Sequence, residues 1–141
     1  MNYKIEKLET VEEMVKTLDL IKELTPDVTY DSYWEMLGEM LPHNYRQVAV
    51  YDENTLIGVS GYWIATKIYC GKYIEIDNLV VAKKYRSKNI GKLLVDWMLD
   101  ETRRSDCKTA LLDAYVENFK AHKFYYREGF VARGFHYLKK L

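Results

Sequence analysis

The sequence predicts a mixed α/β fold in which a mostly antiparallel central sheet of about six strands is flanked by about four helices. Two observations lead to this prediction. Three strand-like runs joined by short turns follow one another between residues 47 and 81, which is typical of an antiparallel meander. Strand-like and helix-like runs then alternate to the end of the chain, which favours a βαβ crossover with a parallel strand pair. Because the chain has 141 residues and no long linker, we expect one domain over residues 1–141.

The N-terminal third is expected to form one strand and two helices. Residues 3–8 alternate apolar with charged side chains, which is the period of a half-buried strand. Residues 11–24 carry apolar side chains at helical spacing, and a Thr-x-x-Glu capping box that starts at Thr10 precedes them. A shorter helix is expected to begin at Asp31, a residue type that caps helices well, and to end at Pro42.

The rest of the chain supplies the remaining elements. Alternating or apolar runs predict five further strands, over residues 47–51, 56–69, 73–81, 109–116 and 130–138. Apolar side chains at helical spacing predict two further helices, one whose face runs from Ile90 to Glu101 and one over residues 118–128. The first of these two has the clearest apolar face, formed by Ile90, Leu93, Leu94, Trp97 and Met98.

The composition is that of an ordinary globular protein, with 48% apolar and 30% charged residues. Since 21 basic side chains balance 21 acidic ones, the chain has no bulk attraction to nucleic acid. Cys70 and Cys107 lie far apart and match no metal-ligand spacing, so we expect free thiols and no metal. The N-terminus does not resemble a signal peptide and no apolar run is long enough to span a membrane, so we expect a cytoplasmic protein.

An anion site is predicted where a strand that carries two acidic residues, Glu75 and Asp77, runs through a basic turn into the amphipathic helix. The first backbone N–H groups of a helix have no partner within it, and the helix dipole adds partial positive charge, so phosphate groups bind well there. Gly91 lets a ligand approach the backbone closely. The basic residues around the turn are Lys83, Lys84, Arg86, Lys88 and Lys92. The nucleotide-binding patterns GxxxxGKS, GxxxxGKT and GxGxxG are absent, which argues against a nucleotide-binding module of another class.

Two motifs follow one another in the second half of the chain. The first, Arg86-Ser-Lys-Asn-Ile-Gly91, matches Arg/Gln-x-x-Gly-x-Gly/Ala except at Asn89, and asparagine tolerates the left-handed backbone that glycine adopts. The second, from Asn118 to Phe130, matches Asn-x-x-Ala-x-x-Phe-Tyr-x-x-x-Gly-Phe at every specified place. Their order and separation, with a strand between them, resemble the GNAT superfamily of acetyl-CoA-dependent N-acetyltransferases over nearly the whole chain.

The resemblance implies a mixed α/β fold of the GNAT type and acetyl-CoA as co-substrate. In this family the backbone amides of the first motif hold the CoA pyrophosphate, a strand N–H polarises the thioester carbonyl, and the strand also holds the pantetheine arm. The residues that the resemblance assigns to acetyl-CoA are Leu79, Val81, Arg86, Ser87, Lys88, Asn89, Ile90, Gly91, Lys92 and Asn118. Asn118 suits equally well the role of N-cap for the helix that follows it.

Acetyl transfer to an amine needs a base and an acid. An alkylammonium has a pKa near ~10, so a base must accept its proton at neutral pH. We expect Glu75 to be this base, directly or through water, because the resemblance places the catalytic glutamate eleven residues before Arg86. Asp77, on the same strand face, is the alternative base. A third reading is that neither is the base and Glu75 is an ordinary solvated or ion-paired strand residue. The resemblance implies that Tyr125 protonates the departing CoA sulfur; otherwise it is a core tyrosine whose hydroxyl reaches the surface.

The acceptor is expected to be a primary amine of a small molecule such as a polyamine, with a protein or peptide amine as the alternative. The aromatic and acidic residues between Thr25 and Trp34 are candidates for recognition of a cationic amine; the alternative is that the aromatic residues form the ordinary apolar face of the second helix. Of Tyr62 and Trp63, which face opposite sides of a strand, only one can line a cleft. A third reading is a non-catalytic acyl-CoA sensor. An exposed C-terminal strand edge would allow a homodimer.

Overall fold

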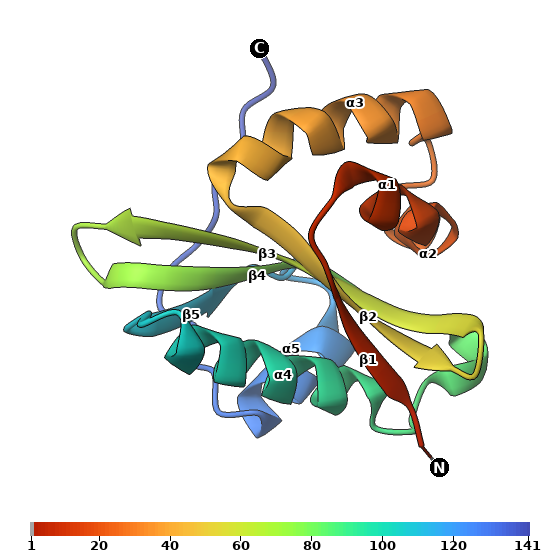
Figure 1. Ribbon diagram of the computed structural model, residues 1–141. Helices are drawn as coiled ribbons and strands as arrows, with labels where there is room; N and C mark the ends of the chain where they lie inside the picture. The colour runs from red at the N-terminus through yellow and green to blue at the C-terminus, as the bar shows by residue number, and fades with distance from the viewer. Residues whose placement is uncertain (1) are drawn as a thin grey trace. The chain divides into compact units, whose positions relative to one another are not determined.

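The computed structural model describes residues 2–141, whose five strands form one sheet in the order β1-β2-β3-β4-β5 (Figure 1). The strands are β1 (Lys4–Leu8), β2 (Tyr45–Asp52), β3 (Thr55–Lys67), β4 (Gly71–Val81) and β5 (Thr109–Leu112). The helices are α1 (Val11–Met14), α2 (Leu18–Leu24), α3 (Tyr30–Met40), α4 (Ile90–Arg104) and α5 (Phe119–Arg127), and the 3₁₀ turns are η1 (Val15–Thr17), η2 (Leu41–His43) and η3 (Lys83–Tyr85). The chain divides into two compact units, one that ends at Leu111 and one that spans Leu112–Leu141.

The sheet is mixed and mostly antiparallel, as predicted. Antiparallel pairing joins β1 to β2, β2 to β3 and β3 to β4, which confirms the meander. The starts of β4 and β5 lie together, because the Lys108 N–H donates to the Lys72 carbonyl over 2.7 Å and the Thr109 hydroxyl donates to the Cys70 carbonyl over 3.0 Å. Two strands that start side by side run in the same direction, so the crossover through α4 gives the parallel pair.

Helices cover both faces of the sheet in the first unit. The short helices α1, α2 and α3 lie on one face and α4 lies on the other (Figure 1). On the first face, the core is formed by fully buried side chains such as Met14, Leu37 and Val59. This arrangement leaves the carboxyl end of β4 as the point where the chain passes from the sheet into α4.

The apolar stripe of α4 packs on the sheet as its periodicity predicted. Ile90, Leu94 and Met98 are at most 2% exposed. A Cβ atom at Gly58 in β3 would come within 2.9 Å of the Ile90 Cγ2 atom, so the glycine lets the start of α4 approach the sheet. The helix that leads from the basic turn is therefore anchored by its first residue.

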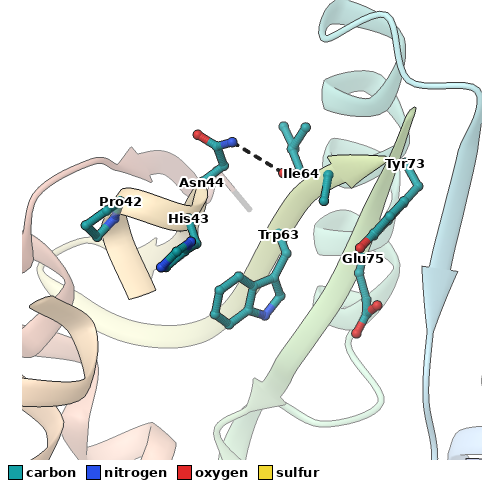
Figure 2. Close-up of a pocket in the computed structure, with 8 residues that line it drawn as sticks. Pro42, His43, Asn44, Trp63, Ile64, Tyr73 and Glu75 are labelled. Atoms are coloured by element: carbon teal, nitrogen blue, oxygen red, sulfur yellow. Dashed lines mark hydrogen bonds between the residues drawn. The ribbon is translucent and has the colours of Figure 1, made fainter. Parts of the chain in front are cut away.

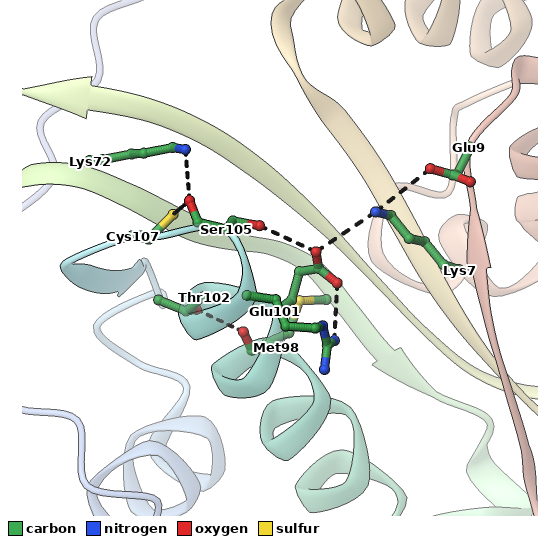
Figure 3. A network of polar contacts seen from close by, with 9 residues as sticks. Lys7, Glu9, Lys72, Met98, Glu101, Thr102, Ser105 and Cys107 are labelled. Carbon is green, nitrogen blue, oxygen red and sulfur yellow. Dashed lines mark hydrogen bonds and ion pairs between the residues drawn. The ribbon is translucent and has the colours of Figure 1, made fainter.

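Polar contacts fix the other end of α4 (Figure 3). Glu101 is only 8% exposed, and its carboxylate accepts from Arg104 over 3.0 Å and from the Ser105 hydroxyl over 3.3 Å. Lys7 of β1 lies 3.7 Å from the same carboxylate, and Lys72 of β4 donates to the Ser105 carbonyl over 2.7 Å. Because a buried charge is costly without partners, these contacts hold Glu101 in place and tie α4 to two strands.

Two details of the N-terminal helices differ from the prediction. The helix expected over residues 11–24 is divided into α1, η1 and α2, although the Thr10 hydroxyl does accept from the Glu13 N–H over 3.1 Å. The prediction that Asp31 caps the next helix is wrong. Thr29 caps α3 instead, in a capping box with Ser32, because both Ser32 and Thr29 offer a hydroxyl and a backbone N–H at the required spacing of three.

The predicted strand over residues 130–138 is wrong, and it accounts for the difference between six expected strands and five. Within the described chain no strand follows α5. Val131 and Phe135 of this segment are 71% and 77% exposed. The alternation of apolar and polar residues is compatible with a strand, but a strand forms only where the edge of another strand is available for pairing.

No helix among residues 2–141 has both the length and the apolar character that crossing a membrane requires.

Candidate active site

A β-bulge interrupts β4 near Leu79, where the resemblance to the family led us to expect the carbonyl-polarising amide. Asp77 pairs with Gly61 and Val80 pairs with Val59, so two residues of β4, Asn78 and Leu79, lie opposite a single residue of β3. Asn78 adopts a left-handed backbone with φ of 56°. A bulge of this kind redirects the N–H groups of the extra residues away from the regular ladder.

Glu75 and Asp77 share one face of β4, as their spacing predicted, and Trp63 lies beside both. Trp63 is the direct partner of Glu75 in the register with β3. Its indole Nε1 donates to Asp77 Oδ2 over 3.0 Å. One oxygen of Asp77 is therefore engaged by the indole, whereas the Glu75 side chain extends toward a pocket.

This pocket has a volume of about 470 Å³ and opens on the sheet face beside the 3₁₀ turn η2 (Figure 2). Its lining residues are Pro42, His43, Asn44, Trp63, Ile64, Ala65, Tyr73 and Glu75. The Trp63 ring and the Glu75 carboxylate lie on neighbouring strands and face the same space. Apolar and aromatic walls with a few polar groups are typical of small-molecule sites.

A cation lies at the edge of the pocket. Lys67 Nζ is 4.0 Å from Glu75 Oε1 and 5.1 Å from the centre of the Tyr73 ring. The side chains of Lys67 and Glu75 are 46% and 30% exposed, so solvent screens this pair. The pocket thus offers a negative and a positive group next to each other.

The basic turn has left-handed backbone at Asn89, as the motif predicted, and also at Ser87, which was not predicted. Ser87 and Asn89 both adopt left-handed backbone, with φ of 64° and 63°. Asn89 is the N-cap of α4, and within the described chain no side chain caps this helix. The first N–H groups of α4 are therefore not bonded by a capping side chain of the described residues, and they follow directly on two left-handed residues. Backbone of this kind forms concave sites in which N–H groups bind anions.

The basic side chains of the turn are exposed, but several already have local contacts. Arg86 Nε donates to the Val81 carbonyl over 3.2 Å and so ties the turn to the end of β4. Lys84 and Lys88 both lie over the Tyr85 ring, at 5.9 Å and 5.3 Å from its centre. The side chain of Ile90 is buried, which leaves only its backbone for a ligand.

Tyr125 and Asn118 lie in the unit Leu112–Leu141. Tyr125 is on α5, where its ring centre is 5.3 Å from that of Phe124 and 6.0 Å from that of Phe130. Burial raises the pKa of the Tyr125 hydroxyl. Asn118 caps α5, because its Oδ1 accepts from the Ala121 N–H over 3.2 Å. Its capping role is thus confirmed, and its contact with CoA stays a prediction.

The structure brings together, in the first unit, both candidate bases, the bulge at Leu79 and the strand end at Val81 that leads into the turn. Sequence reasoning left open which of Tyr62 and Trp63 lines a cleft. Trp63 does so, while Tyr62 packs against α4, where its ring centre is 5.8 Å from that of Trp97. Lys67 was missed, because a lysine at a strand end gives no signal of its own.

Comparison with known proteins identifies the family. The sequence profile described as the acetyltransferase (GNAT) family matches residues 9–130. An uncharacterized N-acetyltransferase, YhdJ, of Bacillus subtilis is 25% identical over 122 residues, 86% of each chain. Glucosamine 6-phosphate N-acetyltransferase of Arabidopsis thaliana is 29% identical over 124 residues, 82% of this chain and 83% of that protein.

A solved structure shares the fold. Aminoglycoside N-acetyltransferase AAC(6')-Iy in complex with CoA superimposes with a TM-score of 0.82 at 17% identity, over 100% of this chain and 98% of that one. The profile match covers most of the sequence, and the left-handed residue Asn89 lies within the first of the two motifs. The chain therefore belongs to the GNAT family and is an acetyl-CoA-dependent N-acetyltransferase.

Proposed function

We propose that this enzyme transfers the acetyl group of acetyl-CoA to a primary amine of a small molecule bound in the pocket beside Glu75. One observation carries the proposal: Glu75 lies on the bulged strand β4 and lines an open pocket of about 470 Å³. A base, an acceptor pocket and a candidate oxyanion amide then lie along one strand, with Glu75 four residues before Leu79.

Acetyl-CoA would bind at the basic turn. The left-handed residues Ser87 and Asn89 and the uncapped start of α4 support backbone contacts from Ser87 to Gly91 with the diphosphate. The exposed Lys88, which lies over the Tyr85 ring, and Lys92, which is 3.4 Å from Asp96, would add positive charge. From this turn the pantetheine arm would run back along Val81, which leads the thioester to Leu79 and the bulge.

The reaction is a direct displacement. The amine nitrogen attacks the thioester carbonyl, a C–N bond forms, the carbon–sulfur bond breaks, and the Leu79 N–H stabilises the negative charge that develops on the carbonyl oxygen. Glu75 accepts the proton that the ammonium loses, directly or through water. Tyr125 gives its proton to the leaving sulfur, and its raised pKa keeps that proton in place at neutral pH.

Glu75 is a better base than Asp77 on the geometry of the pocket. Asp77 does not line the pocket, and its Oδ2 accepts from the Trp63 indole, a contact that favours its role as a support for the tryptophan. Glu75 lines the pocket directly. The aromatic walls formed by Trp63 and Tyr73 would contact the body of the acceptor and its cationic amine.

We further propose that the acceptor carries an anionic group as well as its amine. Lys67 lies beside Glu75, so an acceptor with both charges would pair with both side chains. The Arabidopsis relative acts, by its name, on glucosamine 6-phosphate, which combines an amine with a phosphate. A peptide amine is the alternative acceptor, and a non-catalytic sensor of acyl-CoA is the alternative function.

A panel of acceptors assayed for release of free CoA tests the proposal. We expect turnover with phosphorylated amino sugars above that with the matching unphosphorylated amines, and none with peptides. Glu75→Gln should lower kcat/KM at pH 7 by about 100-fold, since a general base contributes on the order of 10²–10⁴. The loss should shrink toward pH 10, where the free amine no longer needs a base.

Two controls sharpen the assay. Asp77→Asn should keep most of the activity, because the amide can still accept from Trp63. Lys67→Met should raise KM for phosphorylated acceptors and leave KM for the matching amines without a phosphate unchanged. Turnover restricted to peptides would reject the small-molecule acceptor, and binding of acetyl-CoA without consumption of any amine would favour the sensor.

A further inference from the structure

We propose that a buried hydrogen-bond network, formed by Thr17, Tyr33, Gln47 and Tyr45, positions the bulge of β4 and thereby the amide that faces the thioester. The proposal rests on the function proposed above. The members of the network are positioning residues, because they act through Asn78 rather than on a substrate. The network has no place in the resemblance to the family motifs, since it comes from the N-terminal helices and β2.

The network is completely enclosed. Thr17 and Gln47 are 0% exposed, Tyr45 is 1% exposed and Tyr33 is 5% exposed. All four side chains lie in or beside the apolar cluster between the sheet and the helices α1 to α3. Polar groups in such a place lose their contacts with water, so each must find a partner within the protein.

Every donor of the central amide is used. Gln47 Nε2 donates to the Tyr33 hydroxyl over 2.7 Å and to the Tyr45 hydroxyl over 3.2 Å. The Thr17 hydroxyl lies 2.8 Å from that of Tyr33, and its single hydrogen is shared between Gln47 Oε1, at 3.1 Å, and the Met14 carbonyl, at 2.7 Å. The amide is therefore held from both sides and directs an N–H group at Tyr45.

The direction of the last hydrogen bond follows from this arrangement. Because Gln47 donates to the Tyr45 oxygen, the phenolic hydrogen points away from Gln47. Tyr45 donates that hydrogen to Asn78 Oδ1 over 3.1 Å. Burial raises the pKa of Tyr45, so the donor keeps its proton. The chain of bonds thus ends on the side chain of the residue that forms the bulge.

Asn78 is the residue that most needs support. Its φ of 56° is rare for a residue with a side chain and costs free energy unless its surroundings hold it. The register offers it no regular partner, since Asn78 and Leu79 together face one residue of β3. The bond from Tyr45 fixes Asn78, and the orientation of the next peptide N–H, that of Leu79, follows from it.

The position of Tyr45 is in turn fixed by its neighbours on β3. The Tyr45 ring centre is 4.9 Å from that of Trp63. A Cβ atom at Gly61 would overlap the Tyr45 hydroxyl and ring, so the glycine leaves the path that the side chain takes across the strand. Gly61 is also the partner of Asp77, which Trp63 holds. Two consecutive residues of β4 are thus each held by an aromatic side chain.

Tyr45→Phe tests the proposal, because it removes the hydroxyl and keeps the ring. We expect kcat to fall about tenfold or more, since small misplacements of reacting groups cost up to about 10² in rate. The Kd for acetyl-CoA and the KM for the amine should change less than twofold. Hydrogen exchange of the backbone amides from Asp77 to Val80 should accelerate.

Tyr62→Phe is the matched control. Tyr62 is also a tyrosine of the sheet that is 1% exposed, but within residues 2–141 its hydroxyl has no hydrogen-bond partner. This variant should leave kcat and the exchange of the bulge unchanged. Asn78→Gly provides a second test that does not depend on the fold of the Tyr45 variant, because glycine accepts the left-handed backbone while it removes the acceptor.

The double variant of Tyr45 and Asn78 separates positioning from general damage. If the hydroxyl acts through Asn78, the double variant should lose no more kcat than the worse single variant. Additive losses, or a Tyr45→Phe enzyme with wild-type kcat and wild-type exchange, would overturn the proposal. If the wild type acetylates no amine, the proposed function fails, but the exchange rates at the bulge still decide between support and rejection of the network.

Discussion

Tyr125 is the residue whose role is most readily tested alone. Tyr125→Phe keeps the ring that contacts Phe124 and Phe130 and removes only the hydroxyl. We expect kcat to fall about 100-fold, the scale of a lost general acid, with little change in the Kd of acetyl-CoA. Tyr126→Phe, the neighbouring and 58% exposed tyrosine, should be neutral. Equal kcat in wild type and Tyr125→Phe would remove Tyr125 as the acid.

The pH profile gives the same test from another side. An ordinary tyrosine loses half of its acid form near pH 10. Because the pKa of Tyr125 is raised, its proton is retained at higher pH, so kcat should not decline before pH 10. The decline should begin above that value, where the phenol ionises.

At this scale the sequence predicted positions but not partners. The spacing of Glu75 and Asp77 placed both on one face, and their shared contact with Trp63 bears this out. The sequence could not show that Glu75 lines the pocket while Asp77 bonds to an indole, because that indole belongs to Trp63 on another strand. Tyr45 and Gln47 could not be singled out, because a polar residue in a strand gives no sign of a network that only the packed helices complete.

Among the elements, the turn between β4 and α4 shows the closest agreement between sequence and structure. The interpretation of Asn89 as a tolerated replacement for glycine is confirmed by its φ of 63°. The helix that follows was predicted from its apolar stripe. Local rules were sufficient here, because turn chemistry and helix periodicity depend on neighbours in sequence.

Variants of Asn89 test whether this backbone geometry binds the co-substrate. Asn89→Gly should keep the Kd of acetyl-CoA within about twofold, since glycine adopts left-handed backbone freely. Asn89→Val should weaken binding about tenfold or more, because a β-branched residue is strained there by about 1–3 kcal/mol. Calorimetric titration measures both values, and thermal unfolding checks that the variants fold. Wild-type affinity in Asn89→Val would contradict the role of the turn.

The wrong predictions concern elements that depend on contacts which sequence patterns do not specify. The segment over residues 130–138 alternates as a strand does, yet it has no strand partner in the described chain. The N-cap of α3 is Thr29 rather than the predicted Asp31, because the reciprocal hydrogen bonds between Thr29 and Ser32 satisfy more N–H groups than one carboxylate does.

For the whole molecule, the balance of charges agrees with a local rather than a general attraction for anions. The sequence has 21 basic and 21 acidic residues, so we expect affinity for CoA to come from the turn and its backbone. Fold class could be predicted because strand order follows from short connections and one crossover. The acceptor could not be predicted from the sequence, since the pocket combines residues of η2, β3 and β4 that are far apart in the chain.

Amide shifts on titration of the ¹⁵N-labelled enzyme with acetyl-CoA test the central claim, that a bent turn and a bulged strand bind one co-substrate. We predict that the largest shifts fall on the amides from Ser87 to Gly91 and on Leu79 and Val81. Shifts concentrated elsewhere in the chain, or no shifts at millimolar acetyl-CoA, would contradict the account.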